Sequence, residues 1–176
     1  ARIMRFSTAP DLIYPRTGSS FTFSVQATPP YSLISGKHLA NAPADIKYNW
    51  VEFHKWIFKA DYYLPISANT KLVLNSKFNF GYLGYYNKDI GPSPFENFYL
   101  GGDGMSGYNI AGREVIALRG YTTGSVTPVD PVTHTAAGNV YSKLTFELRY
   151  PVSLSAQATI YALAFAEAGK AWYSLK

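Results

Sequence analysis

The stretch Leu72-Val73-Leu74-Asn75-Ser76-Lys77-Phe78-Asn79-Phe80-Gly81-Tyr82 indicates that this chain is built from β-strands. Its aromatic residues fall at even positions, whereas Asn75, Lys77 and Asn79 fall at the odd positions between them. This period of two is typical of a strand with one apolar and one polar face. The same alternation predicts further strands outward along the chain, at Phe21–Thr28, Ile46–Leu64, Val140–Tyr150 and Ala156–Glu167, with the end of another at Met4–Ser7.

The connections between the predicted strands are alternately short and long. Pro65 ends one strand, and Ala68-Asn69 makes a short turn into the strand at Thr70–Tyr85, so these two strands should be antiparallel neighbours. Pro151 is expected to end the strand at Val140–Tyr150 in the same way. We therefore expect an all-β antiparallel meander of about six strands, and the sequence shows no helical period.

The last predicted strand departs from simple alternation. Leu163 and Phe165 lie in phase with Glu167, so that apolar and charged residues share one face. Either of two features would explain this arrangement: packing of the apolar pair against an infolded loop, or a β-bulge that shifts the phase.

The composition favours a membrane β-barrel over a soluble sheet. The chain has 176 residues, enough for one domain, and no Cys for disulfides or thiolate metal sites. Charged residues make up 15% and aromatic residues 16%, whereas soluble domains average about 25% charged residues. Membrane barrels have aromatic girdles and an apolar outer surface. No apolar run reaches the length of about 18 residues that a transmembrane helix needs.

Alternation alone does not decide which face meets water, because a soluble sheet buries its apolar face and a membrane barrel exposes it to lipid. For the barrel we expect Lys55, Lys59, Lys77 and Lys143 to face the lumen. The residues expected to face lipid are Trp56, Phe58, Leu72, Leu74, Phe78, Phe80, Leu144, Phe146 and Leu148.

A long glycine-rich segment, Phe98–Tyr121, separates the predicted strands in the middle of the chain. It begins with Phe98-Tyr99-Leu100-Gly101-Gly102 and ends with Leu118-Arg119-Gly120-Tyr121. Glycines allow tight turns and close approach of the backbone to another surface. The planar guanidinium of Arg119 has five donors, which suits a loop that folds back into a confined, partly polar space.

These two motifs, in this order and with strands on both sides, resemble the sixth extracellular loop of the BamA family of outer-membrane β-barrel assembly proteins. The family has Val-Arg-Gly-Phe at the loop tip, where this chain has Leu118 and Tyr121 at the outer positions. The spacer between the motifs is also longer here. The resemblance extends from about Phe21 to Trp172.

The resemblance implies that residues 1–176 are a single segment of a C-terminal transmembrane β-barrel domain. Single-chain bacterial barrels need at least about eight strands, so about six strands predict an incomplete barrel, and a strand pattern that begins and ends midway predicts an interior piece of a longer protein. The resemblance also implies an integral protein of the Gram-negative outer membrane that folds and inserts β-barrel proteins without a cofactor. Its partners would be unfolded β-barrel clients, accessory subunits of the assembly complex and membrane lipid. In the family, the tetrad arginine contacts acidic residues on the next two strands, which places Glu147 and Glu167 opposite Arg119.

Other functions find little support in the residues. The G-x-G-x-x-G match at 102–107 is not followed by a helix, as a dinucleotide site requires. His38, His54 and His134 are isolated, no G-x-S-x-G elbow is present, and the 16 basic residues are scattered. We therefore predict no catalytic or metal site, no enzymatic activity and no nucleic-acid partner. Three alternatives stay open: a barrel that secretes a partner polypeptide, an outer-membrane enzyme, and a soluble carbohydrate-binding β-domain.

Overall fold

A computed structural model describes residues 1–11, 13–36, 42–67, 71–105, 113–131, 134–155 and 157–174. Several features named above lie outside the described residues: the centre of the glycine-rich segment with Gly107 and Gly112, the predicted turn at Ala68-Asn69, His38 and Ala156.

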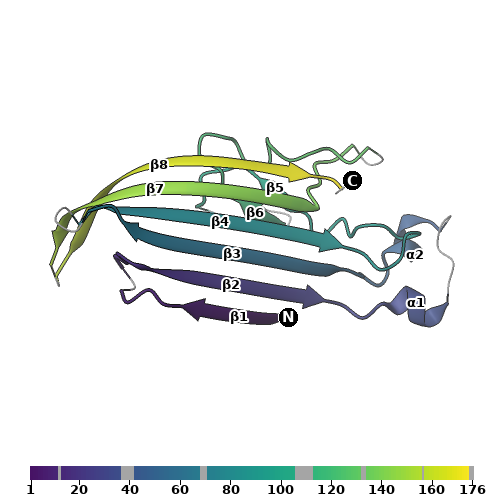
Figure 1. The fold of residues 1–176 in the computed structure, drawn as a ribbon. Helices are drawn as coiled ribbons and strands as arrows, with labels where there is room; N and C mark the ends of the chain where they lie inside the picture. Colours follow the sequence, from purple (N-terminus) through teal and green to yellow (C-terminus); the bar gives the residue numbers. More distant parts are fainter. Residues whose placement is uncertain are drawn as a thin grey trace.

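The described residues form an antiparallel six-stranded sheet in the order β1-β2-β3-β4-β7-β8. The strands are β1 (Arg2–Ser7), β2 (Gly18–Ala27), β3 (His54–Pro65), β4 (Val73–Gly84), β7 (Val140–Leu154) and β8 (Thr159–Trp172). Figure 1 shows the connections β1–β2, β3–β4 and β7–β8 at one end of the sheet, here called the turn end. The longer connections β2–β3 and β4–β7 lie at the opposite end, the loop end. The predicted meander is therefore confirmed.

The start of the third strand differs from the prediction. Residues 46–53 do not extend β3, because the amides of Ile46 and Lys47 donate to the Pro43 carbonyl at 3.1 and 2.9 Å. These bonds form the short helix α2 (Ala44–Lys47), which follows α1 (Tyr31–Ser35) in the β2–β3 connection. The sequence pattern predicted neither helix. Within the described part of the chain, no helix has the length and apolar character to cross a membrane.

Pro151 does not end the seventh strand, contrary to the prediction. β7 continues to Leu154, and the pairing of β7 with β8 shifts register between Pro151 and Ser153. A proline is tolerated at such an irregularity because the extra residue leaves the regular ladder there. The last strand likewise runs further than predicted, from Thr159 to Trp172.

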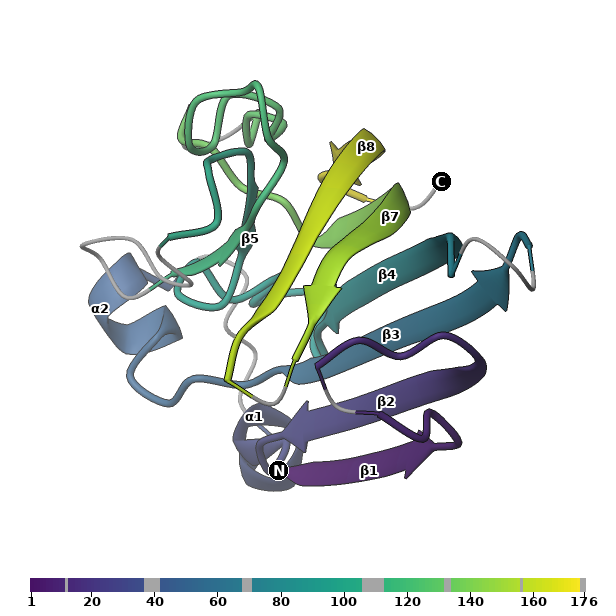
Figure 2. The ribbon, with the colours of Figure 1, turned by 90° about the vertical axis from the view of Figure 1, so that its left-hand side faces the viewer.

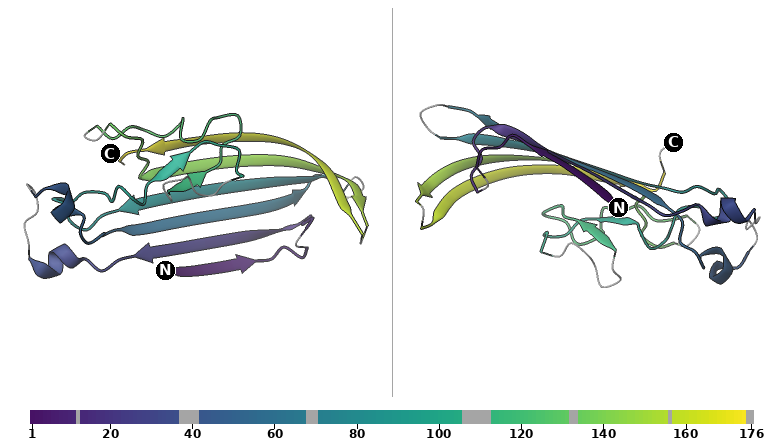
Figure 3. Two further views of the ribbon diagram at one scale, coloured as in Figure 1. Left: turned by 180° about the vertical axis from the view of Figure 1, so that it is seen from behind. Right: turned by 90° about the horizontal axis from the view of Figure 1, so that it is seen from below.

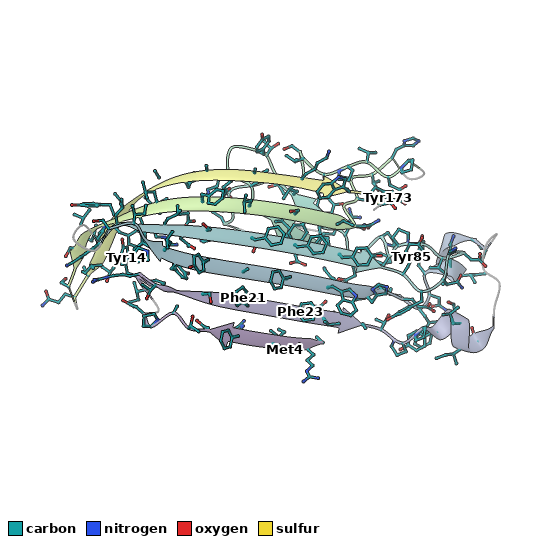
Figure 4. All side chains as sticks on the ribbon, viewed as in Figure 1. Met4, Tyr14, Phe21, Phe23, Tyr85 and Tyr173 are labelled. Atoms are coloured by element: carbon teal, nitrogen blue, oxygen red, sulfur yellow. The ribbon has the colours of Figure 1, made fainter. Side chains whose placement is uncertain are left out.

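The two faces of the sheet divide as expected for a barrel. On the outer face, Trp56, Phe78 and Phe146 are 41%, 38% and 43% exposed. Figure 4 shows part of this face, with Met4 of β1 beside its register partner Phe23 of β2. On the inner face, Lys55 and Lys143 are buried. The predicted orientation of the apolar and lysine-bearing faces is confirmed.

The described parts of the glycine-rich segment pack on the inner face. Its two short strands, β5 (Phe98–Leu100) and β6 (Glu114–Ile116), pair in parallel and form a separate small sheet. Figures 2 and 3 show this layer on the side toward which β7 and β8 curl. The apolar core lies between the two layers and includes Ile57, Leu83, Phe98, Leu100, Leu118 and Tyr141.

The six-stranded sheet is open. β1 and β8 stand at its two ends in the strand order, and the described residues of these strands do not pair with each other. The structure thus has the form of a barrel segment rather than a closed barrel.

Candidate functional site

The two ends of the glycine-rich segment are bonded to each other. The amide of Gly101 donates to the Ile116 carbonyl at 3.0 Å, and the amide of Leu118 donates to the Gly102 carbonyl at 3.1 Å. The amide of Gly102 in turn donates to the Tyr121 carbonyl at 2.9 Å. The Phe98-Tyr99-Leu100-Gly101-Gly102 motif and the Leu118-Arg119-Gly120-Tyr121 motif therefore form one unit, although they are distant in sequence.

Glycines allow this unit to lie close to the sheet wall. The Tyr141 ring occupies the space that a Cβ at Gly81 would need, and Phe98 packs against the same ring at 4.8 Å between centroids. On β8, a Cβ at Gly169 would lie 3.5 Å from both Leu100 and Leu118. Leu118 is 2% exposed, so the residue before Arg119 is fixed against the sheet.

Arg119 is held by Glu167 of β8 through both its backbone and its side chain. The Arg119 amide donates to Glu167 Oε2 at 3.0 Å, and its Nη2 donates to Glu167 Oε1 at 2.7 Å. Glu147 of β7 lies further away, with 3.6 Å between its Oε1 and the same nitrogen. The hydrogen bond to Glu167 is the main cause that raises the pKa of Arg119 above its ordinary value. The guanidinium also lies 3.5 Å from the centre of the Phe165 ring.

The contact with Phe165 explains the mixed pattern of the last strand. Leu163, Phe165 and Glu167 all face inward, and Phe165 and Glu167 are two residues apart beneath the same arginine. A guanidinium stacks on an aromatic face and pairs with a carboxylate at once. The infolded loop, rather than a change of phase, accounts for the apolar residue beside Glu167.

Other cations, which the sequence motifs did not connect to Arg119, complete the network. Lys143 contacts Glu167 Oε1 at 3.0 Å and donates to the Ala117 carbonyl at 2.6 Å, next to the loop tip. Glu147 is held mainly by Arg149 at 2.6 Å and by Lys77 at 3.0 Å. Lys77 and Lys143 were predicted to face inward, but their individual partners depend on strand register, which alternation does not determine.

A second ion-pair cluster fixes the start of the segment. Lys55 of β3 contacts Glu114 at 2.9 Å and Glu96 at 3.3 Å, and its ammonium lies 4.7 Å from the centre of the Phe98 ring. Lys55 is 4% exposed, and a charge so removed from water needs such partners. Alternation placed Lys55 on the inner face but did not indicate its partners.

Tyr121 differs from the other members of its motif. The side chain is 55% exposed, so Tyr121, unlike Leu118, is not buried against the described sheet. Gly120 has a φ of 90°, and a Cβ at this position would meet no heavy atom within 4 Å. The role of Gly120 is therefore to turn the chain rather than to make room for a neighbour.

The described contacts of this site are ion pairs, hydrogen bonds and one cation–π contact. Within the described ranges, no three His, Cys, Asp or Glu side chains are grouped so that they could hold a metal ion. The arrangement of Arg119, Glu167, Glu147 and Lys143 joins a loop to two strands of the wall. Carboxylate–guanidinium pairs of this kind give directional, charge-assisted hydrogen bonds.

An open antiparallel sheet with an apolar outer face, a polar inner face and an inward-folded loop is the architecture of a membrane β-barrel segment. The Omp85 superfamily domain model matches residues 4–175, nearly the whole chain, and the chain therefore belongs to the Omp85 superfamily. A comparison with curated proteins finds no match.

Membership in this superfamily indicates that the sheet is part of a membrane β-barrel. Its members are outer-membrane β-barrels of Gram-negative bacteria or organelles, and they serve in protein insertion or secretion, with client barrels and partner subunits. The outer face of β2, β3, β4, β7 and β8 is thus the membrane-facing surface, and the Arg119 network lies on the lumen side.

Proposed function

We propose that this chain belongs to a BamA-like assembly factor that folds and inserts β-barrel proteins into the outer membrane of a Gram-negative bacterium. The observation that carries the proposal is the bonded unit of the two loop motifs, held to β8 by Arg119 and Glu167. Both motifs match the BamA pattern residue by residue, apart from Leu118 and Tyr121.

The loop acts as an internal support of the barrel wall. It reaches β3 through Lys55, β7 through Tyr141 and β8 through Glu167, so it joins β3 to the neighbouring pair β7 and β8 across the intervening strand β4. A wall supported in this way keeps its curvature when neighbouring barrel strands break their pairing and pair with a client strand instead. We infer that the support matters most while a client is bound.

The reaction needs neither catalysis nor a cofactor. A client strand cannot enter lipid with unpaired backbone groups, since each unsatisfied group costs several kcal/mol there. A barrel that offers strand edges and a supported wall lowers this cost through pairing. We therefore propose a non-enzymatic activity, with unfolded β-barrel clients and accessory subunits as protein partners.

The experiment is reconstitution of the full-length protein into lipid vesicles with an unfolded β-barrel client. Client folding is followed by heat-modifiable gel mobility and protease protection. We expect faster folding than in empty vesicles, and slower folding with Arg119→Lys than with wild type, because an ammonium lacks the planar fork of a guanidinium. Equal folding rates with and without the wild-type protein would refute the assembly function.

The secretion alternative shares the arginine loop, so the same preparation must distinguish it. A secretion barrel would move one partner polypeptide across the vesicle membrane and leave unrelated β-barrel clients unfolded. Folding of several unrelated clients, without release of any of them into the vesicle lumen, is the result expected for an assembly factor.

A further inference from the structure

The two long connections at the loop end enclose a cavity of about 380 Å³. The β2–β3 connection supplies most of its wall, including Tyr31, Trp50 and Glu52, and the β4–β7 connection supplies Ile90. Figure 1 shows α1 and α2, which both contribute to the wall, beyond the ends of β2 and β3. The cavity therefore lies past the membrane-facing strands, and its size falls in the range of about 300–1,000 Å³ that small-molecule sites occupy.

A buried carboxylate forms the most firmly fixed polar part of the wall. Glu52 is 4% exposed and accepts hydrogen bonds from the Ser32 amide and, at 2.8 Å, from the Ser32 hydroxyl. Asn87 Nδ2, from the β4–β7 connection, donates to the same hydroxyl at 3.1 Å. The carboxylate is thus held in place without a ligand. Because an ionised carboxylate has about four acceptor positions, the bonds from Ser32 leave positions to which a ligand hydroxyl can donate.

Two aromatic rings at the rim of the cavity face water. Trp50 is 63% exposed and Tyr31 is 37% exposed, and their ring centroids are 5.0 Å apart. The face of an aromatic ring carries partial negative charge, which attracts the C–H groups on the flat side of a sugar ring. The exposed Trp50 ring next to a fixed carboxylate therefore offers both a stacking surface and a hydrogen-bond acceptor.

The charges of the cavity are balanced. Among the described residues that line it, Glu52 is the one acid and Lys47 the one base, and Asn49 adds an amide. A strongly charged ligand would meet a like charge here. Hydroxyl groups both donate and accept, so a polyhydroxyl ligand suits a wall that carries acceptors at Glu52 and donors at Lys47.

We propose that this cavity binds an uncharged saccharide, with the flat side of one sugar ring on Trp50 and its hydroxyl groups bonded to Glu52, Asn49 and Lys47. In bacterial outer-membrane barrels the longer loops are the extracellular ones, so under the proposed localisation the site lies on the outer surface of the cell. An alkyl chain or an apolar peptide is a poorer fit, because it would cover the polar groups of Glu52 and Lys47 without bonding to them.

The test is saturation-transfer NMR on the full-length protein, and it does not depend on assembly activity. The protein is held in lauryldimethylamine oxide micelles, so that no detergent carries a sugar. The probe is maltose, and sorbitol is the matched compound that has hydroxyl groups but no ring. We expect several-fold stronger transfer to the ring protons of maltose than to the protons of sorbitol. Equal transfer to the two compounds would overturn the proposal.

Choline tests the alternative that the aromatic rings and Glu52 hold a cation, as aromatic cages do. Stronger transfer to choline than to maltose would overturn the saccharide assignment. Competition distinguishes a free glycan from a glycolipid headgroup. In nanodiscs that contain a maltosyl lipid, loss of the maltose signal assigns the site to membrane-anchored sugars, and an unchanged signal assigns it to free glycans.

Two pairs of variants locate the binding. Trp50→Ala should reduce transfer to maltose several-fold, whereas Phe95→Ala, which removes a 56% exposed ring that does not line the cavity, should leave it unchanged. Lys47→Ala should weaken the transfer, and Lys88→Ala, on the β4–β7 connection outside the cavity, should not. Equal effects within either pair would show that maltose binds elsewhere. Heat-modifiable mobility of each variant shows that the barrel is folded.

Discussion

The carboxylate of Glu167 binds both the backbone amide and the guanidinium of Arg119, at 3.0 and 2.7 Å. One side chain on the wall thereby fixes the position of the loop backbone and the direction of the loop side chain together. Because the Phe165 ring lies under the same guanidinium, the arginine has little freedom to choose another partner. This contact connects the loop motif to its proposed function.

Replacement of Arg119 should release the loop tip without unfolding the sheet. The side chain is 33% exposed, so water partly screens the pair, and we expect Arg119→Ala to cost about 1.5–3 kcal/mol, the range for hydrogen bonds to charged groups. Thermal unfolding of the full-length protein in detergent measures the loss. The exposed Arg16 provides the control, and an equal loss for Arg16→Ala would contradict a specific role of Arg119.

The two glutamates should not be equivalent. Glu167→Gln weakens the side-chain bond to Arg119 and the contact with Lys143, so the amide of Arg119 should exchange faster with deuterium. Glu147 is held chiefly by Arg149 and Lys77, so Glu147→Gln should disturb the pairing of β4 with β7 and leave the loop tip protected. Hydrogen exchange resolved by peptide compares the two variants. Faster exchange at Arg119 in the Glu147 variant alone would reverse this assignment.

Local patterns in the sequence were sufficient for the main sheet. Alternation placed Lys55 and Lys143 inward and Trp56 and Phe78 outward, because a strand has a side-chain period of two. Alternation wrongly began the third strand at Ile46 and ended β7 at Pro151. The first outcome depends on backbone hydrogen bonds to the Pro43 carbonyl, and the second on a register shift between β7 and β8.

The candidate site was less predictable than the sheet. Arg119, Glu147 and Glu167 were selected by resemblance, and nothing in composition or period distinguishes Glu167 as the nearer partner. The ion pairs of Lys55 with Glu96 and Glu114 join residues far apart in sequence, and only the folded loop brings them together. Long-range pairs of this kind follow from register and loop conformation, which a single sequence does not specify.

Two glycines on the inner face should respond differently to the same substitution. A Cβ at Gly81 would collide with the Tyr141 ring, whereas at Gly169 it would meet Leu100 and Leu118 at an ordinary 3.5 Å. We expect Gly81→Ala to cost about 1–3 kcal/mol through overpacking, and Gly169→Ala to stay within about 0.5 kcal/mol of wild type. Thermal unfolding measures both. Similar midpoints for the two variants would show that Tyr141 moves aside freely.

At the turn end, Tyr14 joins the β1–β2 connection to strands on the far side of the sheet. It is 2% exposed, its ring packs on Tyr161 at 5.5 Å, and its hydroxyl lies within hydrogen-bond distance of the Lys71 and Arg149 carbonyls, at 3.2 and 3.0 Å. Figure 4 shows it at that end of the sheet. This contact holds the first hairpin against β7 and β8, opposite to the end that the Arg119 loop supports.

Removal of the Tyr14 hydroxyl should therefore weaken the turn end alone. Tyr14→Phe keeps the ring packing and loses one hydrogen bond, which costs about 0.5–1.5 kcal/mol, whereas Tyr14→Ala also empties the ring site and costs about 3–5 kcal/mol. Tyr62, 54% exposed on the outer face, supplies the control variant Tyr62→Phe. Limited proteolysis should cut residues 8–17 faster in both Tyr14 variants, with cleavage near Arg119 unchanged. Equal cleavage of this segment in the Tyr14→Ala and Tyr62→Phe proteins would show that Tyr14 does not hold the hairpin in place.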